Sequence, residues 1–480
     1  MENNHQSFDN LFPMRMSSIE KFHWLDDNDT YPNVVFCRMR IQGKLDESIA
    51  REAWQIAVER QPFADVEPKK VGGRWCWVQG PRGDQNGSRR FEDWRGTRFE
   101  FQEYESATEN WKFKDHLIES STGSYLGVFT WPCDSDAPPI DGTSPTTQQK
   151  SSQTEVWLYV HHAVGDGAGS ILVINDWMII YANLKSNRDP RAGLHRLDPK
   201  LLATRNSINF FSWSYLKHLW KQPIALFGAA KFAFRKTPEL IPPDHRDSDQ
   251  PRHYPSIIGQ WIDADQVSQI SQHAGQHNVT VNTILLGQLY LALAEWRSQQ
   301  SHHGPDDWMR VIMPISIRKV SDRRLPTANR ATLVQIDRQS SQADDLGAFY
   351  YGLNREINII LGWQLDKIFL LAIRVMSLND WILRRAANNK KSRGMAVFTN
   401  LGEPLRKSER AGQRNPDQQA PIRPDEFDLV GPIREGTPVN FSVSRYGPAM
   451  RVSLQYDSKL ISEPQAAELL GGYVSRLKSI

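Results

Sequence analysis

The stretch of sequence that decides the fold runs from Tyr159 to Gly169 and reads Tyr-Val-His-His-Ala-Val-Gly-Asp-Gly-Ala-Gly. The apolar run Glu155 to Val160 leads into the two histidines and is typical of a buried strand. Beyond the stretch, apolar side chains recur at helical spacing at Ile171, Ile174, Met178 and Tyr181. Three glycines lie between the two runs, and glycine tolerates the backbone angles of a tight turn. The sequence therefore predicts a strand, a tight turn and a helix, with two histidines where the strand ends.

His161 and His162 are the residues of this stretch that can carry chemistry. Histidine is the side chain best suited to take a proton from a hydroxyl or an amine near neutral pH. Because adjacent strand residues point to opposite faces, only one of the two can face a site. We predict that His162 is a general base and that His161 is structural. Asp166 could pair with an arginine and hold the turn. The alternative is that both histidines are buried at the strand end without a catalytic role.

The bulk properties of the chain limit its size class and its partners. With 480 residues it is too long for one hydrophobic core, so we expect at least two lobes. The net charge of +3 is too small to favour a nucleic-acid partner. Cys37, Cys76 and Cys133 show no zinc or disulfide spacing and leave an unpaired thiol, which suits a reducing compartment. No signal peptide or membrane-spanning run is visible in the sequence, so we expect a soluble, cytoplasmic protein.

The order of the apolar patterns predicts three parts. We expect an N-terminal lobe over 1–197, a connector over 198–256 and a C-terminal lobe over 257–480. Both halves mix helical patterns with short strands, which indicates an α/β or α+β sandwich. An opening loop is expected before Val34, and helical structure from Asp366 to Ala387. Further strands are expected at Val34–Ile41, Arg74–Gln79, Tyr125–Trp131, Ile257–Ile262, Met309–Ile317, Met395–Thr399, Val439–Ser444 and Met450–Tyr456.

Two other stretches allow more than one interpretation. Ile208 to Lys236 is aromatic and basic and has no acidic residue. It could lie on a membrane surface, or it could be an amphipathic bridge packed across two lobes, as its break at Pro223 favours. The pairs His302-His303 and Asp306-Asp307 resemble metal ligands, but they lie in a polar loop without a preceding strand. We predict a solvated loop there and no metal site.

The histidine stretch resembles the His-His-x-x-x-Asp-Gly motif of the chloramphenicol-acetyltransferase-like superfamily. That group includes condensation domains of peptide synthetases, polyketide-associated acyltransferases, wax ester synthases and plant BAHD acyltransferases. Further segments resemble the family in the same order over nearly the whole chain: Met16–Glu20 with Trp24, Gly43–Asp46, Arg60–Phe63, Met313–Arg318 with Asn329, Thr399–Gly402 and Asn440–Ser442 with Tyr456-Asp457. Gln61 stands where a histidine is usual, and no Asp-Phe-Gly-Trp-Gly segment is present, which speaks against the BAHD branch.

The resemblance implies two similar lobes in a V, joined by a bridge, with a central tunnel in which donor and acceptor meet at His162. It implies that His162 is the base, that Asp166 and Gly167 shape the turn, and that Arg318 is the partner of Asp166. Donors for an oxyanion would come from Thr399, Asn400 and Ser442.

The expected function is transfer of an acyl group from a thioester, on coenzyme A or on a carrier protein, to a hydroxyl or amine. The acceptor would be a small or lipid-like molecule, no cofactor would be bound, and a stand-alone monomer would suffice. Two alternatives stay open. The chain could catalyse peptide-type condensation on carrier-bound thioesters, or it could be a catalytically idle binding member of the fold.

Overall fold

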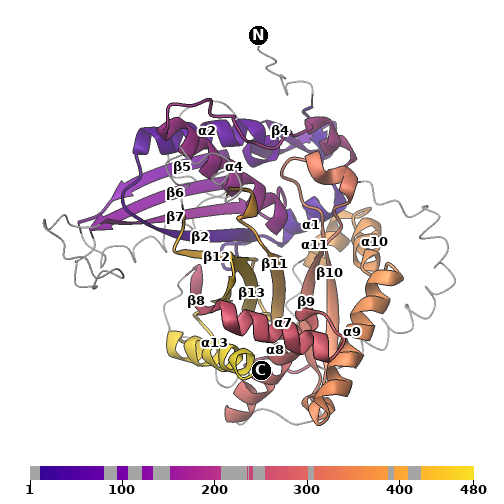
Figure 1. Ribbon diagram of the computed structural model, residues 1–480. Coiled ribbons are helices and arrows are strands. Elements are labelled where there is room, and N and C mark those ends of the chain that lie inside the picture. The colour runs from indigo at the N-terminus through magenta and orange to yellow at the C-terminus, as the bar shows by residue number, and fades with distance from the viewer. Residues whose placement is uncertain are drawn as a thin grey trace, which may run out of the picture.

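Two β-sheets organise the molecule, one in each lobe (Figure 1). The computed structural model describes residues 11–79, 95–105, 122–132, 152–206, 235, 237–241, 254–300, 307–387, 394–408 and 423–480. The mixed α/β architecture predicted from the sequence is confirmed. Nearly all of Ile208–Lys236, most of the connector and His302-His303 lie outside the described residues. Among the helices that are described, none is both long enough and apolar enough to cross a membrane.

The first lobe is built on a five-stranded sheet in the order β12-β2-β7-β6-β5. Its strands are β12 (Glu426–Val430), β2 (Val34–Gln42), β7 (Ser152–His161), β6 (Thr122–Pro132) and β5 (Arg95–Glu103). Helices α2 (Glu47–Arg60) and α4 (Gly167–Lys185) bury their apolar residues against one face. A small sheet of β1 (Met14–Arg15), β4 (Arg74–Gln79) and β3 (Val66–Val71) extends this lobe.

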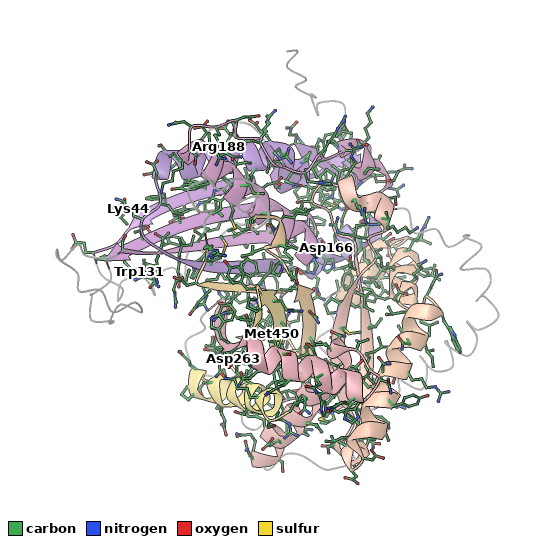
Figure 2. The ribbon with its side chains drawn as sticks, viewed as in Figure 1. Lys44, Trp131, Asp166, Arg188, Asp263 and Met450 are labelled. Atoms are coloured by element: carbon green, nitrogen blue, oxygen red, sulfur yellow. The ribbon has the colours of Figure 1, made fainter. Side chains whose placement is uncertain are left out.

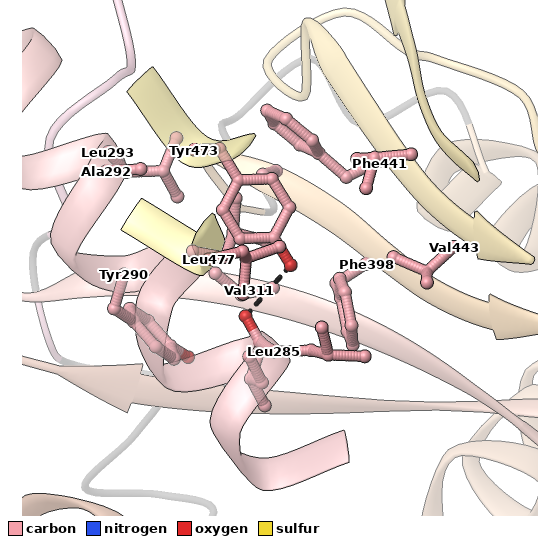
Figure 3. Packing of buried hydrophobic residues seen from close by; sticks show 14 of the residues in the cluster. Leu285, Tyr290, Ala292, Leu293, Val311, Phe398, Phe441, Val443, Tyr473 and Leu477 are labelled. Carbon is pink, nitrogen blue, oxygen red and sulfur yellow. Dashed lines mark hydrogen bonds between the residues drawn. The ribbon is translucent and has the colours of Figure 1, made fainter. Parts of the chain in front are cut away.

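The second lobe carries a six-stranded sheet in the order β10-β9-β11-β13-β14-β8. Its strands are β10 (Ala331–Arg338), β9 (Met309–Ser316), β11 (Ala396–Gly402), β13 (Val439–Tyr446), β14 (Ala449–Tyr456) and β8 (Ser256–Ile262). Helices α7 (Ala264–Gln276), α8 (Val281–Gln299) and α13 (Glu463–Lys478) cover one face of it. Figure 3 shows the core between them, where the Tyr473 hydroxyl donates to the Leu285 carbonyl over 3.0 Å. Helices α9 (Leu346–Gly362), α10 (Lys367–Met376) and α11 (Asp380–Ala387) complete the lobe.

Strand β12 links the lobes, because it comes late in the sequence yet pairs with β2 of the first sheet. Its Asp428 is fully buried. The Asp428 carboxylate accepts from Arg38 Nη2 of β2 at 2.8 Å and from Arg451 Nε of β14 at 2.6 Å. These two arginines hold the pKa of Asp428 well below its usual value even though burial opposes this. The Asp428 carboxylate therefore connects β12 with β2 of the first sheet and with β14 of the second.

The structure corrects two expectations about helices. The opening loop expected before Val34 contains helix α1 (Ser18–Asp26), whose start is fixed by a capping box between Ser17 and Glu20. The helical pattern from Asp366 to Ala387 is two helices, because the chain turns between α10 and α11. Apolar periodicity missed α1 because the side chains that it buries are Glu20, Phe22, His23 and Asp26. The spacing of Ser17 and Glu20 was the signal that could have found it.

Candidate active site

The His-His-x-x-x-Asp-Gly stretch lies at the junction of the lobes, where Figure 2 labels Asp166. Strand β7 ends at His161, and helix α4 begins at Gly167. The His162 N–H donates to the Asn33 carbonyl over 2.7 Å, which fixes the start of the turn. A Cβ on Gly165 would lie 2.9 Å from Val160 and 3.0 Å from Thr327 of the second lobe. The turn therefore needs glycine at this position so that the lobes can approach each other.

Asp166 connects this turn to the second lobe. As the N-cap of α4, its Oδ1 accepts from the Gly169 N–H at 2.7 Å. Arg318 Nη2 donates to the same oxygen over 3.1 Å, which is the ion pair that the family resemblance implied. The Arg330 N–H donates to Oδ2 over 2.8 Å. Both carboxylate oxygens of Asp166 therefore accept hydrogen bonds, from donors of both lobes, so its role in this geometry is to position the turn.

His162 is partly buried between groups of both lobes. The Asn329 amide donates to the His162 carbonyl over 2.7 Å and lies 3.1 Å from ring Nδ1. The pKa of His162 is lowered to about 4, mainly by burial and next by the positive charge of Arg434, while Asp166 acts in the opposite direction. The His162 imidazole is therefore neutral at physiological pH and can accept a proton.

A second histidine, His23 of α1, lies against the first. The two rings stack with centroids 4.1 Å apart and planes 13° from parallel. Burial, and then His162, lower the pKa of His23 well below its usual value. Asn33 Nδ2 lies 3.3 Å from His23 Nδ1, and Arg434 Nη2 lies 3.5 Å from it. Both neighbours are donors, so Nδ1 is the acceptor and the proton of neutral His23 lies on Nε2.

Arg434 is the cation that acts on both imidazoles. It follows β12, and its guanidinium donates to Asp26 of α1 across 2.6 Å. Sequence reasoning identified neither His23 nor Arg434. His23 lies in the segment that was expected to be a loop, and Arg434 is 411 residues from it in the sequence. No local pattern relates such distant positions, although Met16–Glu20 with Trp24 had marked this part of α1 as resembling the family.

His161 faces away from His162 and is buried. Its Nδ1 accepts from the Ala163 N–H at 3.0 Å, and its Nε2 lies 3.3 Å from Asp27 Oδ2. These contacts suit a structural residue that holds the strand end against the loop after α1. His161 is the last residue of β7 and His162 is the first residue of the turn, and their rings have different neighbours.

The three second-lobe residues expected as oxyanion donors lie on neighbouring strands. Thr399 of β11 and Ser442 of β13 are register partners, and Ser442 is buried. The Asn400 amide donates to Asn282 over 3.2 Å at the surface. Among the contacts of the described residues, none joins these three to His162. In the same residues, no group of three His, Cys, Asp or Glu side chains is arranged to hold a metal ion.

Comparison by sequence finds no matching protein-family model and no matching curated protein. Comparison by structure finds three informative likenesses. The trichothecene 15-O-acetyltransferase of Fusarium sporotrichioides has a TM-score of 0.65 and 12% identity, over 97% of this chain and 94% of that one. The epimerization domain from the third module of tyrocidine synthetase B has a TM-score of 0.60 and 14% identity, over 97% and 95%. The starter condensation domain of rhizomide synthetase, in complex with C8-CoA, has a TM-score of 0.60 and 10% identity, over 97% and 94%.

These likenesses cover nearly the whole chain, so it has the two-lobed fold of condensation domains and of this acetyltransferase. The fold expected from the histidine motif is thereby confirmed.

Proposed function

We propose that this chain is an acyltransferase that moves an acyl group from a thioester to a hydroxyl or amine, with His162 as general base. The observation that carries the proposal is a neutral imidazole at the lobe junction, positioned by Asn329 and by the turn that Asp166 holds. The fold supports it, since the similar structures include an acetyltransferase and a condensation domain bound to an acyl-coenzyme A.

The first step requires a free lone pair on Nε2 of His162. In this proposal the ring proton lies on Nδ1, where the carbonyl of His162 itself would accept it, and the hydrogen bond of the ring with its own backbone raises its pKa. Asn329 Nδ2 donates at 2.7 Å to the His162 carbonyl, and this supports the carbonyl that receives the Nδ1 proton. Nε2 would then take the proton of the acceptor while the acceptor oxygen or nitrogen attacks the thioester carbonyl.

The attack produces an oxyanion beside a protonated His162. Arg434 contributes positive charge here, and the charge that lowers the pKa of His162 also favours a developing anion. Thr399 and Ser442 remain the second-lobe candidates for donors, whereas the Asn400 amide is already engaged with Asn282. Collapse of the intermediate breaks the carbon–sulfur bond, and the His162 proton passes to the leaving thiolate. The products are an ester or amide and a free thiol.

The assignment of parts belongs to the same proposal. Residues 1–197 would supply the base and its turn, and residues 257–480 would supply Asn329, Arg318 and the oxyanion donors. One chain would then hold the complete site, so a monomer would be sufficient. Coenzyme A and a carrier protein are both compatible thioester donors.

The test compares the wild-type protein with His162→Ala. Both are incubated with acyl-coenzyme A donors of several lengths, or with acyl groups on a carrier protein, and with a mixed pool of alcohols and amines, and free thiol and acceptor mass are followed. We expect His162→Ala to lose at least about a hundredfold in turnover, the usual contribution of a general base. His195→Ala, at an exposed histidine, is the matched control and should retain full activity.

Each result separates the alternatives. Thiol release that needs His162 together with a mass-shifted acceptor supports the proposal. Full activity in His162→Ala refutes the base assignment. Release only from carrier-bound donors with an amine acceptor favours peptide-type condensation, and no release from either donor type favours an idle binding member.

A further inference from the structure

Helices α10 and α11 expose several large apolar side chains. Figure 1 shows α10 on the outer side of the second lobe. Leu378, in the turn between them, is 86% exposed, and Trp381 is 66% exposed. Val375, Ile382 and Leu371 are also exposed. In α10 the exposed positions Leu371 and Val375 are four residues apart and therefore lie on one side of the helix. We call these five residues the α10–α11 face.

Basic residues accompany the α10–α11 face. Arg374, Arg384 and Arg385 are exposed, and the Arg385 guanidinium lies 5.6 Å from the centroid of the Trp381 ring. The acidic residue of these two helices, Asp380, forms an ion pair with Lys21 of α1. The side chains left to meet a partner are therefore cationic and apolar together.

The opposite side of both helices is anchored in the protein. Leu370 and Ile373 of α10 and Leu383 of α11 are buried, and Ile373 and Leu383 pack with Phe22 of α1. Both helices are therefore amphipathic in an unusual sense: the side that faces the protein is packed, and the side that faces outward also carries apolar residues. A soluble protein rarely leaves such a patch uncovered without an interaction to make there.

We infer that the α10–α11 face docks on an anionic lipid surface. Helices that lie in a membrane interface insert tryptophan and aliphatic side chains at the level of the headgroups and carry basic residues beside them. Arginines near such a surface are attracted to the negative charge of its lipids. The inference stands independently of the proposed function.

The position of α1 connects this face to the candidate active site. Phe22 packs against α10 and α11, and the next residue, His23, stacks on His162. One short helix therefore separates the docking face from the site. Docking would bring the lobe junction close to the lipid surface.

The test is flotation of the full chain with vesicles of phosphatidylcholine alone or with about one third phosphatidylglycerol, a range in which basic residues respond strongly. We expect the wild type to float with the anionic vesicles and much less with the neutral ones. Leu378→Ser with Trp381→Ser should lower the vesicle partition coefficient at least about tenfold, since two apolar side chains no longer insert. Arg374→Gln with Arg384→Gln should lower it on anionic vesicles by about tenfold as well.

The control is Val71→Ser, which removes an exposed apolar side chain, 41% accessible, from β3 of the first lobe. It should float as the wild type does, and circular dichroism should show every variant folded. The inference is overturned if the wild-type protein floats with neither kind of vesicle. It is also overturned by flotation that the α10–α11 variants leave unchanged, which would move the contact to another segment such as Ile208–Lys236. Sedimentation that shows a wild-type dimer converted to a monomer by Leu378→Ser with Trp381→Ser would instead identify the face as a self-interface and would also overturn it.

Discussion

Arg434→Gln tests whether the charge around His162 sets the pH range of the base. Arg434 Nη2 lies 3.5 Å from His23 Nδ1, and the His23 ring centroid lies 4.1 Å from that of His162. These two distances and the radius of the His23 ring place the guanidinium at most about 9 Å from the His162 ring, where two unit charges interact by at least about 1.8 kcal/mol at an effective dielectric constant of about 20. Halving this value for solvent screening leaves a shift in pKa of roughly one unit.

The direction of the shift follows from both partners of the ion pair. Removing Arg434 takes away a positive charge that lowers the pKa of His162, and it leaves the carboxylate of Asp26 without this partner. Both changes favour the imidazolium, so the pKa of His162 should rise from about 4 to roughly 5 or above. Since only the neutral imidazole acts as a base, kcat/KM falls on the acid side of this pKa, and that fall should move to higher pH by the same amount.

The assay is kcat/KM for thiol release across pH 4 to 8, together with nitrogen-15 NMR titration of the histidines, which needs no substrate. Arg445→Gln, at an exposed arginine of β13, is the matched control and should leave the profile in place. A wild-type acid limb near 6.5, the ordinary value for histidine, would refute the electrostatic reasoning. An Arg434→Gln profile that coincides with that of the wild type would refute the assignment to Arg434.

Three further predictions concern residues that position the site. His23→Ala removes the stacked ring and should lower kcat/KM at least about tenfold. His23→Phe should restore most of the loss because it keeps the stack. A Phe variant as slow as the Ala variant would show that a ring nitrogen is required. Asp166→Asn should cost about 2 to 3 kcal/mol of unfolding free energy in urea, because Arg318 loses its ionic partner; an unchanged midpoint would contradict this. Asp428→Asn should cost about 3 to 5 kcal/mol in the same assay at pH 7, because Arg38 loses its ion-pair partner and Arg451 keeps only Glu426. Its effect should diminish as the pH falls through the lowered pKa of Asp428, where the wild-type carboxylate is itself protonated, and an equal effect at all pH values would contradict the ion-pair explanation.

The histidine stretch could be interpreted from the sequence because its geometry is local. An apolar strand, a glycine turn and a helical repeat follow one another within about thirty residues, and each has its own periodicity. The structure has β7 ending at His161 and α4 beginning at Gly167, with Asp166 as the cap. The prediction that His162 and not His161 acts as the base rests on the alternation of side chains along a strand, whereas β7 ends at His161 and His162 opens the turn.

The surroundings of His162 could not be predicted in this way, for two physical reasons. Helix α1 buries polar side chains, so it lacks the apolar stripe by which a helix is recognised in a sequence. Strand β12 carries Asp428 at its centre, and a charged residue there argues against a buried strand unless its arginine partners on β2 and β14 are known. Both elements depend on contacts between distant segments, and they bring His23 and Arg434 to the site.

The pKa of His162 depends on burial and on Arg434 more than on the charge within the motif. Within the motif, the nearest charge is that of Asp166, which raises the pKa of His162. Asp166 accepts from Arg318 and from two backbone N–H groups, so much of its negative charge is balanced. Burial and Arg434 act in the opposite direction and prevail. Two proteins of this fold could therefore share the motif and its geometry and still work in different pH ranges, according to the residues that α1 and the segment after β12 place beside the second histidine.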